Sequence, residues 1–235
     1  LEEADKLLKD GENFNGDPVY GGDINKWRKL VNSFELKVLI NLYNKADDAD
    51  LKVKERFTAL LSKPLFTSNA DNFQLIFSDK AGQKYPFYKE GNNYLDYNML
   101  TSIVIDSLKS FQDYRLFYYA EPTGKSVTDG KNPSDWTAYE GVDPTRPFTE
   151  IKGMYSEPKA ARTYCQLNKR YYEIPEGEPI FLLSYSDVKF ILAEAVVRGL
   201  VAGDAKTYYE EGVKAAMKFT ADMTPDGFDH GMPIT

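Results

Sequence analysis

The sequence predicts an all-α protein, in which amphipathic helices and helical hairpins carry a long irregular loop region and a few short strands. Two observations predict this class. Apolar residues recur at spacings of three and four along residues 24–43, 184–199 and 203–217, which is the period of one helix face. Most of the prolines and several glycines fall between residues 121 and 179, where they interrupt regular structure.

The first residues predict an amphipathic helix that continues from an earlier part of a fold. Leu1, Ala4, Leu7 and Leu8 lie on one helical face over residues 1–8. The N-terminus lacks a basic segment followed by an apolar one. We expect the preceding helices, with any export signal or lipid-bearing cysteine, to lie outside this sequence.

The pattern over residues 24–43 predicts a long helix. Asp23 is its expected N-cap, because a carboxylate accepts hydrogen bonds from the free amides of the first turn. The preceding Gly21 and Gly22 let the chain enter sharply. A second helix is predicted over residues 51–61 and ends before Pro64. The apolar face of the long helix contains Ile24, Trp27, Val31, Phe34, Val38 and Leu42.

Less regular segments follow these helices. Residues 66–97 carry glycines and a proline among aromatic residues, and they predict a loop with one short strand. A third helix is predicted from residue 97 or 98 to residue 109. The bulky aromatic run over residues 113–119 predicts a short extended segment. The apolar face of the third helix contains Leu100, Ile103, Val104 and Leu108.

Residues 121–179 form the predicted irregular loop region. A structureless stretch of this length inside a compact domain is more often functional or disordered than idle. Binding residues also concentrate on loops that a rigid scaffold positions. This region is therefore where we expect a binding surface.

A pair of helices is predicted near the C-terminus. Ser184 and Asp187 have the spacing of a capping box, and the helix that they begin ends near Gly199. The next helix starts at residues 203–204. Helices joined by about four residues are expected to lie antiparallel, so we predict a tetratricopeptide-like hairpin. The tail from Thr220 contains proline and glycine, and we expect it either to be frayed or to be cut off from further helix.

Charge and composition exclude several classes of protein. The chain has 29 basic and 36 acidic residues, a net charge of −7, and no basic run, so nucleic acid is not an expected partner. No stretch approaches the ~20 apolar residues that span a bilayer. The single cysteine, Cys165, cannot form an internal disulfide.

Four blocks of the sequence resemble the SusD/RagB family of outer-membrane nutrient-binding lipoproteins. Residues 16–23 (GDPVYGGD), with Lys26-Trp27 and Asn32-Ser33, form the first block. Residues 113–122 (DYRLFYYAEP) form the second, with Tyr114 where the family has proline. Residues 183–195 (LSYSDVKFILAEA) and 203–213 (GDAKTYYEEGV) form the third and fourth.

The resemblance implies a fold and a function. The fold is a single SusD-like helical domain over residues 1–235, with the N-terminal and C-terminal parts of the family fold absent. The function is binding of oligosaccharides, or in some members peptides, at the cell surface. The family delivers them to a SusC-like TonB-dependent transporter, and its members contact the outer membrane through a lipid anchor.

Catalytic and metal chemistry have little support in the sequence. His230 is the only histidine, near the expected frayed end, so a triad with a serine or Cys165 is not expected. No phosphate loop, zinc spacing or dinucleotide motif is present, and we predict no cofactor and no metal. An all-α glycosidase is the enzymatic alternative. The acidic groups at residues 47–50 and 129–132 lack calcium-loop spacing and favour turns.

The candidate ligand-binding residues are aromatic side chains with polar neighbours in the irregular segments. An aromatic ring stacks on a sugar face, and polar side chains fix the hydroxyl groups. The alternative is that these rings pin loops onto the scaffold, and a peptide-binding or protein-binding scaffold is the alternative function. The candidates are Trp136, Tyr139, Asn132, Asp135, Tyr88, Tyr94 and Tyr97.

Overall fold

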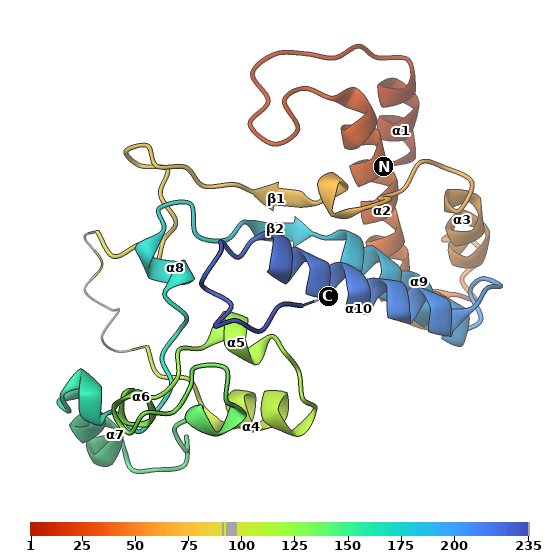
Figure 1. The fold of residues 1–235 in the computed structure, drawn as a ribbon. Helices are drawn as coiled ribbons and strands as arrows, with labels where there is room; N and C mark the ends of the chain where they lie inside the picture. The colour runs from red at the N-terminus through yellow and green to blue at the C-terminus, as the bar shows by residue number, and fades with distance from the viewer. Residues whose placement is uncertain (91, 93–97, 235) are drawn as a thin grey trace. The chain divides into compact units, whose positions relative to one another are not determined.

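The computed structural model describes residues 1–90, 92 and 98–234 (Figure 1). The predicted all-α class is confirmed, because 47% of the residues are helical and the strands are short. The chain folds into two compact units. The first unit contains residues 1–76 and 180–219, and the second contains residues 77–179 and 220–235.

The first unit is built from helices that pack around one core (Figure 1). Leu36 and Leu39 are fully buried in this core, together with Phe57. The predicted apolar faces of the first two helices are wrong in part: Phe34 and Leu7 are exposed, because other residues of the same helices face the core. The helices are α1 (Glu2–Lys9), α2 (Ile24–Asn41), α3 (Val53–Leu60), α9 (Tyr185–Val197) and α10 (Ala205–Asp222) up to residue 219, where the first unit ends.

The loop before α2 is organised by the carboxylate of Asp17. It accepts hydrogen bonds from the amides of Val19, Tyr20 and Gly22, at 2.9–3.0 Å, and from Nε1 of Trp27 at 2.8 Å. Desolvation opposes ionisation, but these donors outweigh it and lower the pKa of Asp17 to about 2. The predicted N-cap is confirmed, since Asp23 accepts from the first amides of α2. The first motif block therefore anchors α2.

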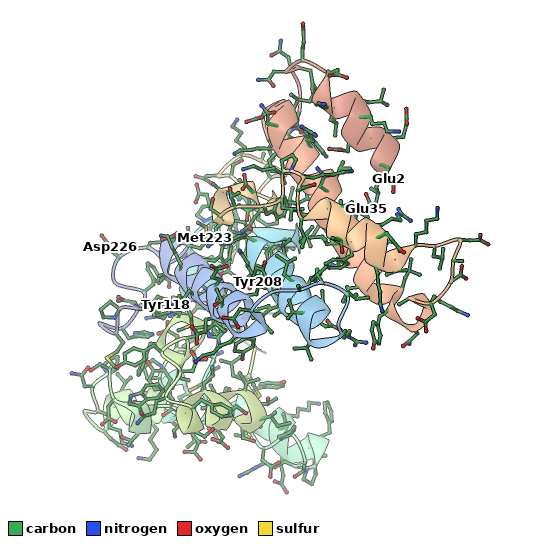
Figure 2. The ribbon with its side chains drawn as sticks, turned by 90° about the vertical axis from the view of Figure 1, so that its right-hand side faces the viewer. Glu2, Glu35, Tyr118, Tyr208, Met223 and Asp226 are labelled. Carbon is green, nitrogen blue, oxygen red and sulfur yellow. The ribbon has the colours of Figure 1, made fainter. Side chains whose placement is uncertain are left out.

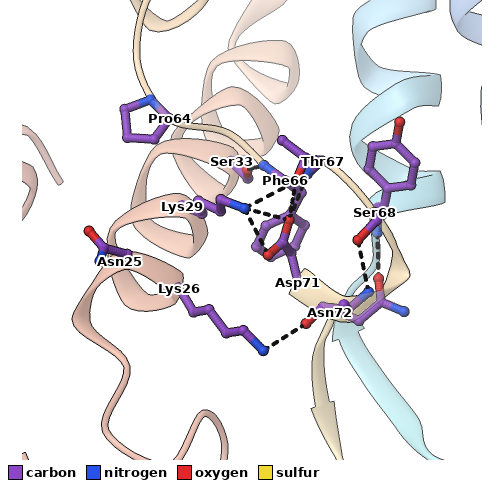
Figure 3. Close-up of polar contacts among 12 residues, drawn as sticks. Asn25, Lys26, Lys29, Ser33, Pro64, Phe66, Thr67, Ser68, Asp71 and Asn72 are labelled. Carbon is purple, nitrogen blue, oxygen red and sulfur yellow. Dashed lines mark hydrogen bonds and ion pairs between the residues drawn. The ribbon is translucent and has the colours of Figure 1, made fainter. Parts of the chain in front are cut away.

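A second polar network joins α2 to the segment that follows α3 (Figure 3). Asp71 is buried and accepts from Lys29 Nζ at 2.9 Å and from the amide of Thr67 at 2.7 Å. Burial raises the pKa of Asp71, but these donors outweigh it and hold the pKa below its usual range. Asn72 Oδ1 accepts from the amide of Tyr185 at 2.7 Å, which joins the same segment to α9.

The strands form a small antiparallel ribbon within the first unit. β1 (Phe73–Leu75) pairs with β2 (Ile180–Leu183), with Phe73 opposite Leu183. The strand predicted within residues 66–97 is therefore confirmed as β1. Its partner was not expected, because it lies more than 100 residues further along the chain.

Helices α9 and α10 form the predicted hairpin. The capping box is confirmed: Ser184 Oγ accepts from the amide of Asp187, whose carboxylate accepts from the amide of Ser184. A Cβ atom at Gly212 would lie 2.8 Å from the ring of Phe190, and one at Gly203 would lie 3.1 Å from Val196. The end of α9 therefore meets the residues just before α10, and the middle of α9 meets the middle of α10, as in an antiparallel pair.

The second unit is built from short helices separated by turns (Figure 1). Its core contains Ile105, Leu116, Phe117 and Tyr118, with Tyr139 and Cys165. Cys165 is a free thiol, as expected. The helices are α4 (Ser102–Ser110), α5 (Leu116–Tyr119), α6 (Gly124–Thr128), α7 (Phe148–Tyr155) and α8 (Arg170–Glu173).

Two predictions for residues 97–119 are wrong. Helix α4 begins at Ser102, because the amides of Leu100 and Ser102 donate to the carbonyls of Cys165 and Val142. Its buried residue is Ile105, while Ile103 is 66% exposed. The run over residues 113–119 was predicted to be extended, but it ends in a helical turn, α5. Its consecutive residues Leu116, Phe117 and Tyr118 are all buried. A strand would place neighbouring side chains on opposite faces and could not bury all three in one core.

The predicted frayed tail is also wrong. The carbonyl of Phe228 accepts from Asn168 Nδ2 at 2.7 Å, and the amide of Ile234 donates to the Tyr118 hydroxyl at 2.8 Å. Met232 and Ile234 pack against the core of the second unit. The tail is ordered because it supplies both apolar surface and hydrogen bonds to this unit.

Candidate functional site

A cavity of about 510 Å³ lies in the second unit and includes one of the predicted ligand-binding residues, Tyr88. We call it the Tyr88 hollow. Aromatic and proline rings alternate around it with polar and charged side chains, a combination that suits a ligand with both apolar faces and hydroxyl groups. The hollow is lined by Gly82, Lys84, Tyr85, Pro86, Tyr88, Glu90 and Asn92.

Backbone hydrogen bonds hold this segment in place. The amide of Tyr85 donates to the carbonyl of Pro175 at 2.7 Å, and the amide of Lys89 donates to the carbonyl of Tyr172 at 2.9 Å. The amide of Tyr88 closes a turn onto the carbonyl of Tyr85 at 2.9 Å. The ring of Tyr88 is therefore presented by a turn that is fixed at both ends.

Tyr85 forms the floor of the hollow. Its buried ring has Phe77 at 5.2 Å and Tyr171 at 6.5 Å between centroids. Gly177 lies so close that a Cβ atom there would be 2.3 Å from the Tyr85 ring. Burial, reinforced by the nearby Glu178 carboxylate, raises the pKa of the Tyr85 hydroxyl, so Tyr85 stays neutral. The floor is consequently closely packed and uncharged.

A buried guanidinium supports the structure around the floor. Arg170 is 1% exposed, and its Nε donates to the carbonyl of Tyr118 at 2.9 Å. Its Nη2 lies 2.6 Å from the Glu178 carboxylate. The guanidinium also lies 4.1 Å from the centroid of the Tyr171 ring. These contacts position the aromatic residues on which Tyr85 rests.

Lys84 and Glu90 are the two charged residues that line the hollow. Lys84 forms ion pairs with Glu90 and, at 3.4 Å, with Asp79. Its amine lies 4.9 Å from the centroid of the Tyr88 ring. The hydrogen bond with Glu90 raises the pKa of Lys84, so the amine is charged at neutral pH. The lining accordingly offers donors and acceptors beside an aromatic ring.

The remaining described candidates share one turn elsewhere in the second unit. Trp136 is half-buried in a 3-10 turn, with Phe117 at 4.7 Å and Tyr114 at 5.8 Å between ring centroids. Asp135 is exposed and caps this turn by accepting from the amide of Thr137. Asn132 is exposed and accepts from Ser134.

Tyr139 lies in the core and not on the surface. Its side chain is 1% exposed, and its hydroxyl donates to the carbonyl of Pro133 at 2.7 Å. The ring packs against Phe117 at 5.3 Å. In this conformation, Tyr139 can support Trp136 and Asp135 but offers little surface to a ligand.

Tyr94 and Tyr97 lie outside the described residues. The sequence did not indicate Lys84 and Glu90, which line the hollow with Tyr88, or Tyr114, which packs against Trp136. Tyr114 had a usable signal, because it replaces a proline of the family motif. Lys84 and Glu90 had none, since charged residues are common throughout the chain.

The side chains that could act as a nucleophile, a base or a metal ligand are not arranged for catalysis among the described residues. Burial raises the pKa of the Cys165 thiol to about 12, so the nucleophilic thiolate is scarce at neutral pH. His230 Nε2 lies 3.6 Å from Glu121. Within the described residues, no cluster of three acidic, histidine or cysteine side chains could hold a metal ion. No described helix is long and apolar enough to cross a membrane.

Comparison with known proteins decides the family. The profile of a SusD-like family, described as starch-binding and associating with the outer membrane, matches residues 1–230. The chain belongs to the SusD-like family. The resemblance carried by the four motif blocks is thereby confirmed. No curated protein matches this SusD-like chain.

Solved structures agree with this assignment. A SusD homologue from Bacteroides fragilis is 43% identical, with a TM-score of 0.89, over 100% of this chain and 49% of that chain. Another from the same species is 34% identical, with a TM-score of 0.77, over 94% and 48%. A chitin-binding protein is 25% identical, with a TM-score of 0.62, over 97% and 50%. The chain spans about half the length of these structures.

Proposed function

We propose that this SusD-like protein binds oligosaccharides without altering them and delivers them to a SusC-like TonB-dependent transporter. In this proposal it is a surface-exposed lipoprotein of the outer membrane, anchored by a lipid outside the present sequence. The family description and the chitin-binding relative support a carbohydrate ligand.

The observation that carries the proposal is the Tyr88 hollow. An aromatic ring beside amide, amine and carboxylate groups matches the alternating apolar and hydroxyl surfaces of a sugar. Asn92 is held by its Nδ2 donating to the carbonyl of Pro86 at 3.1 Å. We place the primary contact at Tyr88, and Tyr94 and Tyr97 stay predictions near it in sequence.

Trp136 is the second proposed contact. Its ring is half-buried and Tyr114 beside it is 41% exposed, so the two rings form an aromatic edge at the surface. Asp135 and Asn132 flank this edge and can accept from sugar hydroxyls. We assign Tyr139 to its support.

The test is calorimetric titration with maltose-series and chitin-series oligosaccharides. Tyr88→Ala should weaken binding about tenfold, because an aromatic contact contributes on the order of 1 kcal/mol beyond its buried area. Trp136→Ala should weaken binding if both rings touch one glycan. Phe148→Ala is the control, since Phe148 is 75% exposed in the same unit and outside both places. Full affinity in Tyr88→Ala, with unchanged melting, would remove the hollow from the site.

A protein-binding or peptide-binding scaffold is the second candidate function. The strand ribbon of the first unit exposes Leu75 at 57%, Ile180 at 46% and Leu182 at 63%. Exposed apolar side chains on edge strands are typical of surfaces that contact other chains. Peptides in the same titration panel test this function, and binding of a peptide with no glycan bound would favour it. Release of reducing sugar would instead favour the glycosidase alternative.

A further inference from the structure

The loop between α1 and α2 carries the one Asn-Gly pair of the sequence, Asn15-Gly16. Glu2 marks the start of α1 in Figure 2, and this loop leaves the other end of that helix. An asparagine before a glycine is chemically labile, because glycine has no Cβ atom to keep the following backbone nitrogen away from the side-chain amide carbon. The fold decides whether such a pair reacts, since hydrogen bonds can hold the two groups apart.

Both groups of this pair are accessible. Asn15 and Gly16 are exposed. Among the residues that the structure describes, neither the Asn15 side chain nor the Gly16 amide forms a hydrogen bond. A Cβ atom at Gly16 would have nothing within 4 Å, so the space beside the Gly16 nitrogen is open. The side-chain carbon of Asn15 can therefore approach this nitrogen without breaking a contact.

The residues on either side of the pair are anchored. The amide of Phe14 donates to the carbonyl of Gly22 at 3.2 Å. The carboxylate of Asp17 accepts from three amides of the turn that follows it. Asn15 and Gly16 thus form the free tip of a loop with two fixed ends, and their reaction does not require the loop to unfold.

Other asparagines are protected in different ways. The Oδ1 atom of Asn13 accepts from the amide of Ile24 at 3.1 Å, and the next residue is a bulky phenylalanine. Asn32 is 0% exposed. Asn132 precedes a proline, whose nitrogen carries no hydrogen. Asn15 should consequently react before these three.

We infer that Asn15-Gly16 is a site of spontaneous deamidation and isomerisation in the folded protein. The deprotonated amide nitrogen of Gly16 attacks the side-chain carbonyl carbon of Asn15 and forms a new C–N bond. The bond from this carbon to the side-chain nitrogen breaks, and ammonia leaves with the proton that Gly16 lost. Water then opens the cyclic imide at either carbonyl carbon, which gives aspartate or isoaspartate at residue 15. No oxidation or reduction takes place.

The reaction changes the loop that leads into α2. Both products add a carboxylate to a chain whose net charge is already −7. The isoaspartate product also adds a methylene group to the backbone between the anchored residues Phe14 and Asp17. The inference concerns a loop of the first unit and does not depend on the proposed glycan function.

The test is incubation of the whole chain under native conditions at mildly alkaline pH. Peptide mapping by mass spectrometry, with fragmentation that distinguishes aspartate from isoaspartate, measures the conversion. Asn15 should convert at least about tenfold faster than Asn13, which is held by a hydrogen bond and precedes a bulky side chain. Equal rates at the two residues would overturn the inference. Conversion of Asn15 in urea but not in the folded chain would also overturn it, because the folded loop would then protect the pair.

Matched glycine substitutions identify the attacking group. Gly16→Ala places a Cβ atom beside the attacking nitrogen and should slow conversion of Asn15 at least about tenfold. Gly21→Ala is the control, because Gly21 lies in the same loop, also has a positive φ and also has open space around its Cβ position. This control should not slow the conversion. Equal slowing by the two substitutions, or none by Gly16→Ala, would overturn the inference.

Discussion

Two adjacent glycines of the first motif block, Gly21 and Gly22, are required for different reasons. Gly21 and Gly22 both have positive φ, at 63° and 84°, a region that residues with a Cβ atom rarely adopt. A Cβ atom at Gly22 would lie 1.5 Å from the carbonyl oxygen of Phe14, whereas one at Gly21 would have no neighbour within 4 Å. Gly21 is therefore needed only for its positive φ. Gly22 is needed for its positive φ and also because a side chain would collide with the backbone of Phe14.

The two glycines provide a matched pair of substitutions. Gly21→Ala should lower the free energy of unfolding by about 1 kcal/mol, the usual cost of the left-handed region. Gly22→Ala should lower it by at least about 3 kcal/mol, because the loop must also move away from Phe14. Urea denaturation measures both values. Equal losses would show that the contact with Phe14 is not constraining.

At the scale of elements, α1 is attached mainly by charged side chains. Its buried residue is Asp5, whose carboxylate is bound by Arg28 and Asn32 of α2 and by Lys63. Leu7, by contrast, is 68% exposed. Burial opposes ionisation of Asp5, but these donors outweigh it and lower its pKa to about 2. The attachment of α1 therefore depends on ionised Asp5.

The depressed pKa predicts a pH dependence of stability. At pH values above the ordinary carboxyl pKa of about 4, ionised Asp5 should contribute on the order of 2 kcal/mol, and this contribution should be lost as pH falls from about 4 to 2. Urea denaturation at pH 6, 4 and 2 measures it. The difference between wild type and Asp5→Asn should shrink over this range. Asp10→Asn, at the exposed end of α1, is the control, and a pH-independent difference for Asp5→Asn would contradict the prediction.

At the scale of the whole molecule, both compact units are assembled from distant parts of the chain. Strands β1 and β2 join the two parts of the first unit. The second unit is completed by residues 220–234, which contribute hydrogen bonds to Asn168 and Tyr118. Folding of each unit therefore requires closure of a long loop between its parts, which carries an entropic cost.

Removal of the last residues should weaken the second unit. Deletion of residues 232–235 removes Met232 and Ile234 from its core and should lower its stability by roughly 2 kcal/mol, from the apolar area lost. Native-state hydrogen exchange at Ile105 and Phe117 measures this change. Phe111→Ala is the control, because Phe111 is 82% exposed. Unchanged exchange after the deletion would mean that the tail does not stabilise this unit.

Helix positions and caps could be predicted because their causes are local. Asp23 accepts from amides two and three residues away, and Ser184 and Asp187 cap each other across three residues. The hairpin of α9 and α10 followed from a short connection between two helical patterns. The candidate site was predicted only in part: Tyr88 lines a cavity, but neither its partner Lys84 nor the burial of Tyr139 had a local signal.

The sequence by itself determined the helical class, the positions of the long helices α2, α9 and α10 and, through four motif blocks, the SusD-like family. Only the tertiary structure decided which side chains are buried. Leu36 is buried and Phe34 exposed on one helix, and Asp5 is buried where Leu7 is not. Periodicity shows that apolar residues recur, but a residue faces the core only when distant segments cover it. A hydrogen bond between residues two to four positions apart depends only on the local sequence, whereas burial of a side chain depends on contacts with distant parts of the chain.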